Sequence, residues 1–333
     1  MVNNHRIAVV IPCFRVKSHI MAVLAGIGPE VWRVYVVDDC CPEDSGAFVK
    51  EAQCDSRVVV LRNPRNLGVG GATVTGYRQA LADGATILVK MDGDGQMSGA
   101  DVTALVHPIQ RGVADYAKGN RFYDFRYLKS MPAIRVFGNG CLSLISKLSS
   151  GYWNLMDPTN GFTAIHARVL EALDLDKIER RYFFESDMLY RLYLVRAVIW
   201  DVPIAARYQN EISNLKISLA VIEFSFKHFW RIVARVFYTY YLRDFQLGSL
   251  LLIAGGILSS FGISFGAYHW HRSAVVGVPN TGGTVMLAAL PCLIGLQLLL
   301  TFLGGDINNV PNRVIHPLLP TPPRSGVQLE PDE

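Results

Sequence analysis

The chain lacks the features that mark several common protein classes. Its six cysteines include no C-x-x-C pair and no metal-type spacing, so they predict neither a zinc site nor a disulfide framework. A net charge of +4 over 333 residues gives no support to nucleic acid as a partner. The first apolar run is short and contains Pro12, which argues against a secretory signal peptide there. We therefore interpret the cysteines as reduced thiols of a cytosolic domain.

The glycine-rich stretch from Asn66 to Gly71 also lacks two common nucleotide-binding signatures. No Gly-Lys-Ser/Thr follows it, as in a Walker loop, and it does not follow the first apolar run with the spacing of a dinucleotide fingerprint. The sequence therefore indicates neither an ATPase nor an NAD enzyme. Gly68 and Gly70 open a helical stretch, where bare backbone can approach a phosphate or a sugar. Tight packing of a turn explains these glycines equally well.

Short apolar runs alternate with helical stretches in the N-terminal part of the chain. The helical stretches are Ser18 to Gly26 and Ala72 to Asp83. This alternation predicts an α/β domain with a Rossmann-like, mostly parallel sheet. The apolar runs that we expect to form its strands are Ile7 to Ile11, Val31 to Val37, Val58 to Leu61 and Thr86 to Met91.

Two carboxylates and an amide follow the last of these runs. Asp92, Asp94 and Gln96 lie at alternate positions in a turn that contains two glycines. The turn follows a predicted strand, and open α/β sheets bind ligands at the carboxyl ends of their strands. Oxygen ligands of this kind suit Mg²⁺ or Mn²⁺ shared with substrate phosphates. A solvated acidic turn is the simpler alternative for this motif taken alone.

Further polar clusters follow in the central part of the chain. Arg121 and Arg135 belong to a basic segment, and arginine suits bidentate binding of phosphate. Asp157 and Glu185 lie among turn and aromatic residues, where either is a candidate general base. For each arginine alone a solvated surface is the simpler interpretation, and the two acids can equally cap a turn and a helix.

The C-terminal third has the composition of a membrane segment, in keeping with a mean hydropathy of +0.24 for the whole chain. Lys227, Arg231 and Arg235 recur every fourth residue among aromatic side chains, which predicts a basic amphipathic helix at a membrane surface. Residues 247–268 and 284–303 carry no formal charge and are long enough to span a bilayer. The excess of arginine before the first span places the N-terminal domain in the cytoplasm. The predicted parts are a cytosolic domain (1–212), the basic helix (213–244), a transmembrane hairpin (245–304) and a tail with a disordered end (305–333).

In order and spacing, these motifs resemble the family 2 glycosyltransferases of the GT-A fold. Within that family the chain is similar to the polyprenyl-phosphate glycosyltransferases, the group of dolichol-phosphate mannose synthase and the GtrB-type enzymes. The resemblance covers nearly the whole chain. Its motifs are Val9-Val10-Ile11-Pro12, Val36-Val37-Asp38-Asp39, Asn66-x-Gly68-x-Gly70, Asp92-x-Asp94-x-Gln96, Gly119-Asn120-Arg121 and the two C-terminal spans.

The resemblance implies a role for each matching residue. Asp94, Asp157, Arg121 and Glu185 are implied to be catalytic, and Arg121 with Arg135 to hold the acceptor phosphate. The implied nucleotide-sugar site comprises Pro12, Phe14, Asp39, Asn66, Gly68, Gly70 and Asp92, and the implied metal ligands are Asp92, Asp94 and Gln96. Several positions depart from the usual pattern of the family and touch donor contacts, so they put the identity of the donor in doubt. These are Cys13, Phe14, Cys40, Cys41, Gly93 and Gly95.

The function that the resemblance implies is the inverting transfer of one sugar to polyprenyl phosphate at the cytoplasmic face of a membrane, most typically a bacterial inner membrane. The donor is a nucleotide sugar of the UDP-glucose, UDP-N-acetylglucosamine or GDP-mannose type. One alternative is a subunit of a polysaccharide synthase, although the Gln-x-x-Arg-Trp motif is absent. A second is a non-catalytic membrane scaffold that binds nucleotide sugars. Gly262 and Gly266 would permit close helix packing, and with it a homo-oligomer.

Overall fold

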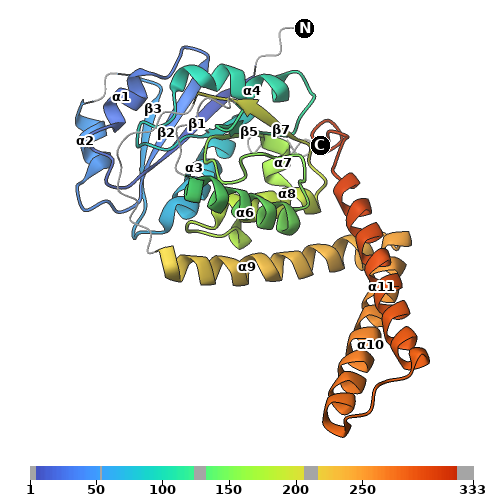
Figure 1. Cartoon of the computed structure of the whole chain (residues 1–333). Helices are drawn as coiled ribbons and strands as arrows, with labels where there is room; N and C mark the ends of the chain where they lie inside the picture. The colour runs from blue at the N-terminus through green and yellow to red at the C-terminus, as the bar shows by residue number, and fades with distance from the viewer. Residues whose placement is uncertain (1–4, 53–54, 124–132, 206–216, 321–333) are drawn as a thin grey trace, which may run out of the picture. The chain divides into compact units, whose positions relative to one another are not determined.

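The computed structural model describes residues 5–52, 55–123, 133–205 and 217–320 (Figure 1). The chain divides into two compact units. We call the first the sheet unit, which comprises Met1–Ser150, Asn154–His228 and Pro311–Glu333. The second is the hairpin unit, which comprises Gly151–Trp153 and Phe229–Val310. The sheet unit therefore includes chain from both sides of the hairpin.

The sheet unit is built on seven strands in the order β3-β2-β1-β4-β6-β5-β7. The first four strands of the chain pair in parallel, and β7 is parallel to β5. Only β6 runs antiparallel, between β4 and β5. This confirms the predicted mostly parallel α/β sheet. The strands are β1 (Ile7–Cys13), β2 (Val31–Asp38), β3 (Val58–Arg62), β4 (Ile87–Lys90), β5 (Tyr116–Asn120), β6 (Thr163–His166) and β7 (Ile199–Pro203).

Helices cover both faces of this sheet. Val9 of β1 lies in one core cluster with Val102 and Leu105 of α4. Val10 points to the opposite face, where a Cβ added to Gly76 of α3 would lie 2.3 Å from its Cγ1 atom. Figure 1 shows α3 and α4 on these two sides. The helices of the unit before α9 are α1 (Ile20–Ala25), α2 (Ser45–Ala52), α3 (Gly68–Ala82), α4 (Val102–Gln110), α6 (Ala133–Ser150), α7 (Ala167–Glu171) and α8 (Phe184–Leu194).

The C-terminal segment 311–320, here called the strap, packs back onto the sheet unit. Asp115 is fully buried at the start of β5 and accepts hydrogen bonds from the backbone N–H groups of Ile315 and His316. The His316 ring nitrogen Nδ1 lies 2.8 Å from the same carboxylate, and the ring stacks on His166. Although burial raises the pKa of Asp115, these hydrogen bonds hold that pKa below its usual value. One carboxylate thus joins the strap to the sheet.

His166, on whose ring the strap residue His316 stacks, makes the stability of the sheet unit sensitive to acid. Burial, with the neighbouring charges of His316 and Arg168, lowers the pKa of His166 to about 4. In the unfolded chain this pKa is near 6.5. The stabilisation linked to neutral His166 is therefore complete above pH 6.5 and falls as the pH drops towards 4. We expect His166→Asn, which keeps an acceptor for the Arg168 N–H, to recover about 1–2 kcal/mol of this loss at pH 5.

Thermal melts of the detergent-solubilised protein between pH 7 and pH 5 measure this effect. The matched control is His107→Asn, because the His107 side chain is exposed on α4. Equal pH slopes for wild type and His166→Asn would contradict a role for His166 in acid sensitivity.

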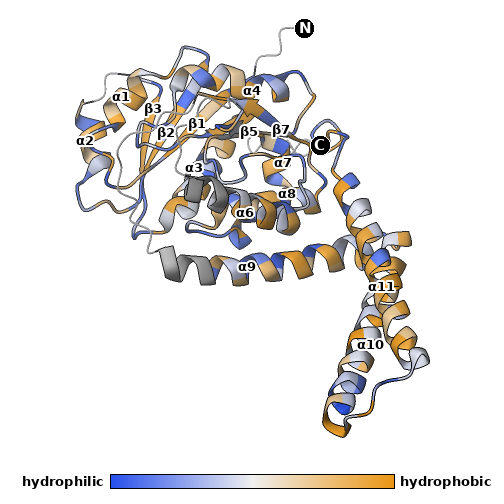
Figure 2. Cartoon of the chain, in the orientation of Figure 1, coloured by the Kyte–Doolittle hydropathy of each residue, from blue (hydrophilic) through white to orange (hydrophobic). Residues whose placement is uncertain are grey.

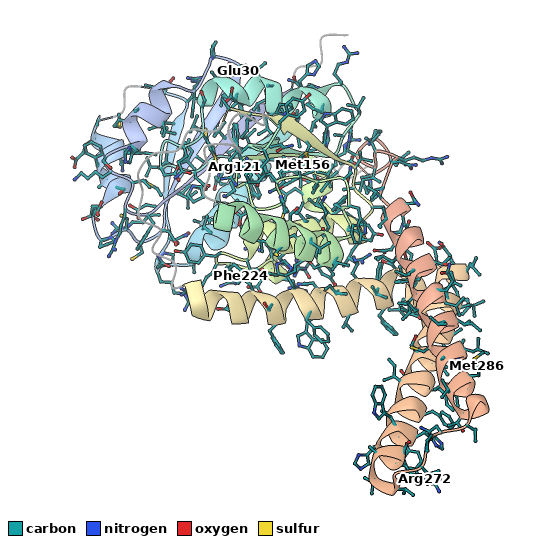
Figure 3. All side chains as sticks on the ribbon, in the orientation of Figure 1. Glu30, Arg121, Met156, Phe224, Arg272 and Met286 are labelled. Atoms are coloured by element: carbon teal, nitrogen blue, oxygen red, sulfur yellow. The ribbon has the colours of Figure 1, made fainter. Side chains whose placement is uncertain are left out.

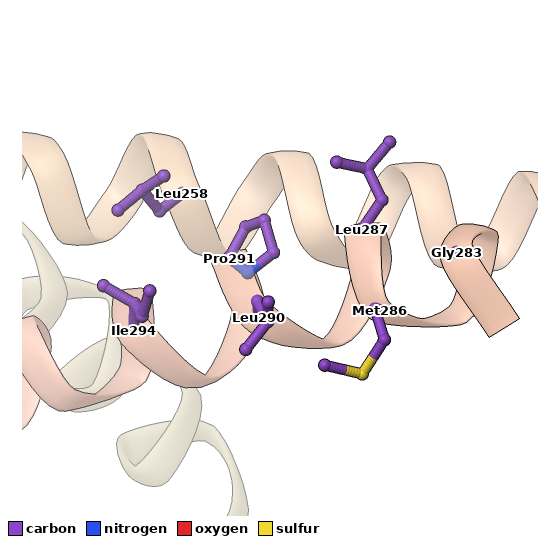
Figure 4. A pocket seen from close by; sticks show the side chains of 7 residues that line it. All are labelled: Leu258, Gly283, Met286, Leu287, Leu290, Pro291 and Ile294. Atoms are coloured by element: carbon purple, nitrogen blue, oxygen red, sulfur yellow. The ribbon is translucent and has the colours of Figure 1, made fainter.

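The hairpin unit contains two helices, α10 (Leu247–Val276) and α11 (Gly282–Asn308), that are long and apolar enough to cross a membrane. Most of their surface is apolar and exposed, as Figure 2 shows. They begin close to the predicted spans and extend beyond their ends. A shallow apolar cavity of about 360 Å³ lies around Pro291 (Figure 4). Its wall carries no ionisable side chain and therefore offers no acid–base chemistry.

The glycines of α10 serve packing within the chain. A Cβ added to Gly262 would lie 2.7 Å from the carbonyl oxygen of Ala288, and one added to Gly266 would lie 3.3 Å from the Ala288 Cβ. The close approach that we predicted for Gly262 and Gly266 therefore joins α10 to α11. These glycines give no evidence for an oligomer, which stays a prediction.

Helix α9 (Ile217–Phe237) continues into a short π-helix, Tyr238–Arg243. Its basic residues share one face, as their spacing predicts, but this face turns towards protein carboxylates. Lys227 lies 3.0 Å from both Glu179 and Glu223. The exposed side chains in the described part of α9 include four aromatic ones, Phe226, Phe229, Trp230 and Phe237.

Arg235 corrects the prediction of a basic membrane-facing surface most clearly. Its side chain is 2% exposed and donates two hydrogen bonds to Asp306, at 2.7 and 3.0 Å. The hydroxyl of Tyr240 and the indole N–H of Trp153 donate to the same carboxylate. A buried charge needs such partners, so Arg235 joins α9 to α11 and is not available to lipid headgroups. Arg231 is also only partly exposed.

Candidate active site

A cavity of about 1290 Å³ lies at the carboxyl ends of β1, β2 and β4. This is the edge of an open α/β sheet at which ligands bind. The structure brings most of the predicted site residues together on its wall. They are Pro12 near the end of β1, Phe14 directly after β1, Asp39 after β2, Asn66 and Gly68 before and at the start of α3, Asp92 and Asp94 after β4, and Glu185 from α8.

A buried lysine links two of these acids. Lys90, the last residue of β4, has a side chain only 1% exposed, and its Nζ donates to Asp92 Oδ1 at 2.8 Å and to Glu185 Oε1 at 2.9 Å. Burial by itself lowers the pKa of Lys90, but the charges of Asp92 and Glu185 outweigh this and raise it above its usual value. Glu185 is thus held by an ammonium group, which favours an orienting role over that of a general base.

Sequence analysis missed Lys90, although the sequence contains a signal for it. A lysine ends the apolar strand Ile87–Lys90, directly before the acidic turn. A charged residue at a fully buried strand position requires a counter-charge. Asp92, two residues after Lys90, and Glu185, from the distant helix α8, provide this counter-charge.

The acidic turn is ordered by its own backbone. Gln96 donates its N–H to Asp94 Oδ1 at 3.0 Å, and Gly95 adopts a φ of +81°, which favours glycine. Gly161 faces Asp92 closely, since a Cβ there would lie 2.6 Å from Asp92 Oδ2. Lys90 therefore occupies one carboxylate oxygen of Asp92, and Gly161 leaves space beside the other.

This turn fits a hard divalent cation that takes further ligands from its substrate. Asp92 and Asp94 supply carboxylate oxygens on the cavity wall, the donor type that Mg²⁺ and Mn²⁺ prefer. Within the described part of the chain, no group of three or more His, Cys, Asp or Glu residues could hold a metal alone. Phosphate oxygens and water would therefore complete the coordination. A role for the Gln96 side chain stays a prediction.

Asp39 organises the glycine-rich loop. Its buried carboxylate accepts hydrogen bonds from the side-chain amide of Asn63 and from the backbone N–H groups of Leu67 and Gly68. These bonds satisfy N–H groups at the start of α3, which explains why this helix begins at Gly68 and not at Ala72 as predicted. Contact between Asp39 and a nucleotide base stays a prediction.

The glycines of this loop accommodate a neighbouring segment. Gly68 has a φ of +82°, and a Cβ on it would lie 2.6 Å from the carbonyl oxygen of Arg180. At Gly70 the corresponding distance to the carbonyl oxygen of Glu179 is 2.4 Å. Of the two explanations offered above, tight packing is the one that the structure supports for Gly70. Gly70 is buried beneath the start of α8, and its predicted contact with the nucleotide sugar stays a prediction.

Arg121 and Asp157 form a two-point ion pair, and neither is among the described residues that line the cavity. Arg121 donates through Nε at 2.7 Å and through Nη2 at 3.1 Å to the two oxygens of Asp157. Asp157 is fully buried, so this pairing favours positioning of Arg121 over proton transfer to a substrate. Arg135 belongs to α6, but its side chain lies outside the described residues, so its predicted phosphate contact is not placed.

Comparison with known proteins identifies relatives of this chain. The family model described as glycosyl transferase family 2 matches residues 8–174. A UDP-N-acetylglucosamine–dolichyl-phosphate N-acetylglucosaminyltransferase from Methanococcus voltae is 28% identical over 241 residues, which cover 68% of this chain and 94% of the relative. An undecaprenyl-phosphate mannosyltransferase from Micrococcus luteus is 32% identical over 191 residues, which cover 57% and 77%.

Solved structures include a more distant match. Glucosyl-3-phosphoglycerate synthase from Mycobacterium tuberculosis, crystallised with Mn²⁺, UDP-glucose and phosphoglyceric acid, superposes with a TM-score of 0.49 at 20% identity. The superposition covers 69% of this chain and 79% of that protein.

Removal of the Lys90 charge should destabilise the sheet unit strongly. Lys90→Met leaves Asp92 and Glu185 close together without their shared counter-ion, and breaking a buried ion pair costs about 3–5 kcal/mol. The exposed Lys177→Met, which removes a surface pair with Asp174, should cost less than about 1 kcal/mol. Denaturant or thermal unfolding of the solubilised protein measures both.

A double variant separates charge from packing. Glu185→Gln added to Lys90→Met removes one of the two orphaned carboxylates and should recover part of the lost stability. Strictly additive losses would show that the Lys90–Glu185 pair contributes nothing to the fold.

Proposed function

The chain belongs to glycosyl transferase family 2, and from this premise we propose that it transfers one sugar from a nucleotide sugar to polyprenyl phosphate at a membrane. The relative from Methanococcus voltae acts on a dolichyl phosphate and that from Micrococcus luteus on an undecaprenyl phosphate, which supports this class of acceptor. They transfer different sugars, so UDP-glucose, UDP-N-acetylglucosamine and GDP-mannose are all candidate donors.

The observation that carries the proposal is the grouping of Asp39, Asp92 and Asp94 around one cavity at the strand ends. Asp92 and Asp94 would hold Mg²⁺ or Mn²⁺, which neutralises the diphosphate that leaves with the nucleotide. Phe14 is 41% exposed on the same wall and would cover the base. Asp39 fixes the loop beside this position.

The chemistry requires little from a general base. A phosphate monoester has its second pKa near 6 and is mostly a dianion at neutral pH. One of its oxygens attacks the anomeric carbon, a new C–O bond forms, and the nucleotide diphosphate departs with the electrons of the broken bond. Attack from the opposite face inverts the anomeric centre. The pairing of Glu185 with Lys90, and of Asp157 with Arg121, is consistent with orienting roles for both acids.

A membrane hairpin suits an acceptor with a long apolar chain. Such a lipid stays in the bilayer, so its phosphate must be met at headgroup level. Arg231, Arg235 and Arg243 precede the first span, whereas the loop between the spans carries only Arg272. The positive-inside rule then assigns the sheet unit to the cytoplasm. The strap supports an even number of spans, because chain on both sides of the hairpin belongs to the sheet unit.

A donor panel tests the proposed function. The full-length protein in detergent receives Mg²⁺ or Mn²⁺, undecaprenyl phosphate and, in turn, UDP-glucose, UDP-N-acetylglucosamine, UDP-galactose or GDP-mannose. Mass spectrometry of the lipid fraction should detect one lipid-linked monosaccharide and so identify the donor. Nucleotide release without a glycosylated lipid would refute the acceptor, and no turnover with any donor would favour the scaffold alternative.

Asp94→Ala removes a proposed metal ligand and should lower transfer by roughly 100-fold or more, the scale of loss when a group that stabilises transition-state charge is deleted. The same variant should bind Mn²⁺ in the presence of UDP or GDP more weakly, measured by titration calorimetry. Asp176→Ala is the matched control, because Asp176 is exposed and pairs only at the surface with Arg78. Wild-type turnover by Asp94→Ala would remove the acidic turn from the mechanism.

A further inference from the structure

The glycine-rich loop packs directly against the segment Glu179–Glu185. Gly71 donates its N–H to the carbonyl oxygen of Arg180, and a Cβ on Gly68 would approach that oxygen and the Arg181 side chain to 2.6 and 3.0 Å. Phe184 in turn lies over Gly70. Because no side chain intervenes, the segment is held at a fixed position against the loop. It delivers Arg181, Tyr182 and Glu185 to the cavity wall.

Arg181 is a cation of this wall that no acid neutralises in the described part of the chain. Its side chain is exposed, and within the described residues that side chain has no hydrogen bond or ion pair. Lys90 is shared between two carboxylates, and Arg121 is engaged by Asp157. Arg15 lies 5.5 Å from the centroid of the Phe14 ring. An uncommitted guanidinium beside a cavity rich in acids is suited to an incoming phosphate, to which it can donate two parallel hydrogen bonds.

Apolar side chains line the same cavity as Arg181. Tyr182 is the next residue and is 60% exposed, so the wall opens to the surface here. Leu142 of α6 and Phe224 of α9 line the same cavity (Figure 3, which labels Phe224). The combination of this cation with aliphatic and aromatic surface matches a phosphate attached to an apolar chain. A nucleotide diphosphate has no such chain.

We propose that Arg181 binds the phosphate of the lipid acceptor, with Tyr182, Leu142 and Phe224 in contact with its first isoprene units. This inference rests on the proposed function and assigns its acceptor subsite. It takes the place of the phosphate contact predicted for Arg121, whose guanidinium is committed to Asp157. Phosphate could also arrive here on the donor, so the test has to distinguish the two sources.

Binding measurements on the full-length protein in detergent separate them. The acceptor probe is farnesyl phosphate, with farnesol as the probe that lacks the phosphate. UDP and GDP, each with Mn²⁺, probe the donor side. Arg181→Gln should weaken farnesyl phosphate roughly 10- to 100-fold, the range for loss of a charge-assisted hydrogen bond, and leave farnesol and both nucleotides within about twofold. Arg181→Lys should restore part of the affinity.

Arg180→Gln is the matched control. Arg180 is also an exposed arginine, and it contacts the glycine-rich loop through its backbone carbonyl oxygen. Among the described residues it is not part of the cavity wall. Its substitution should leave all four probes unchanged. In the transfer assay, Arg181→Gln should raise the KM for polyprenyl phosphate while the KM for the donor stays constant.

Three outcomes would overturn the inference. Weaker nucleotide binding with unchanged farnesyl phosphate would assign Arg181 to the donor diphosphate. Equal effects of Arg180→Gln and Arg181→Gln would reduce the role to general surface charge. Unchanged binding of every probe would exclude a phosphate contact. Failure of the proposed function has a different signature, because the wild-type protein would then yield no lipid-linked sugar from any donor.

Discussion

The contact between Lys90, Asp92 and Glu185 is the constraint on which the rest of the site depends. It ties the end of β4 to the first turn of α8, across 95 residues of sequence. The start of α8 also packs against the glycine-rich loop, and Asp39 joins that loop to the end of β2. The walls of the cavity formed by β2, β4, the glycine-rich loop and α8 are thereby joined to one another. The Lys90 ammonium group also offsets part of the repulsion among the acidic side chains of the site. A bound metal–diphosphate therefore has less of this repulsion to overcome.

Buried charge pairs join distant segments at three further places. Asp115 connects the strap to β5, Asp306 connects α11 to α9, and Asp157 holds Arg121. In each case one carboxylate accepts several donors, which makes its burial tolerable. Their geometry is more specific than apolar packing, because removal of one partner leaves a charge without compensation. The chain thus uses acids for architecture as well as for chemistry.

Sequence reasoning located the first four strands and the acidic turn well, because the runs around Val9, Val36 and Val89 are both apolar and β-branched, but it did not predict β5, β6 or β7. It could not choose between two uses of Gly70, since the partner lies more than 100 residues away in Glu179 and Phe184. The same reasoning found the common face of Lys227 and Arg235 but not its direction. Periodicity shows which residues share a face, whereas the direction of that face depends on carboxylates at Glu179 and Asp306. The sequence shows Lys90 as a charged residue at the end of an apolar run, but it does not show that Glu185 is its second partner.

The strap has a consequence for biosynthesis. Asp115 receives Ile315 and His316 only after 200 further residues have been made, and both long apolar helices, α10 and α11, lie in that interval. While the ribosome is still translating the hairpin, the buried carboxylate at the start of β5 has no strap to pair with. Contacts of such long sequence separation form late, since the intervening chain must be ordered first. The contact that joins the strap to the sheet unit therefore forms only after both helices of the hairpin unit have been synthesised.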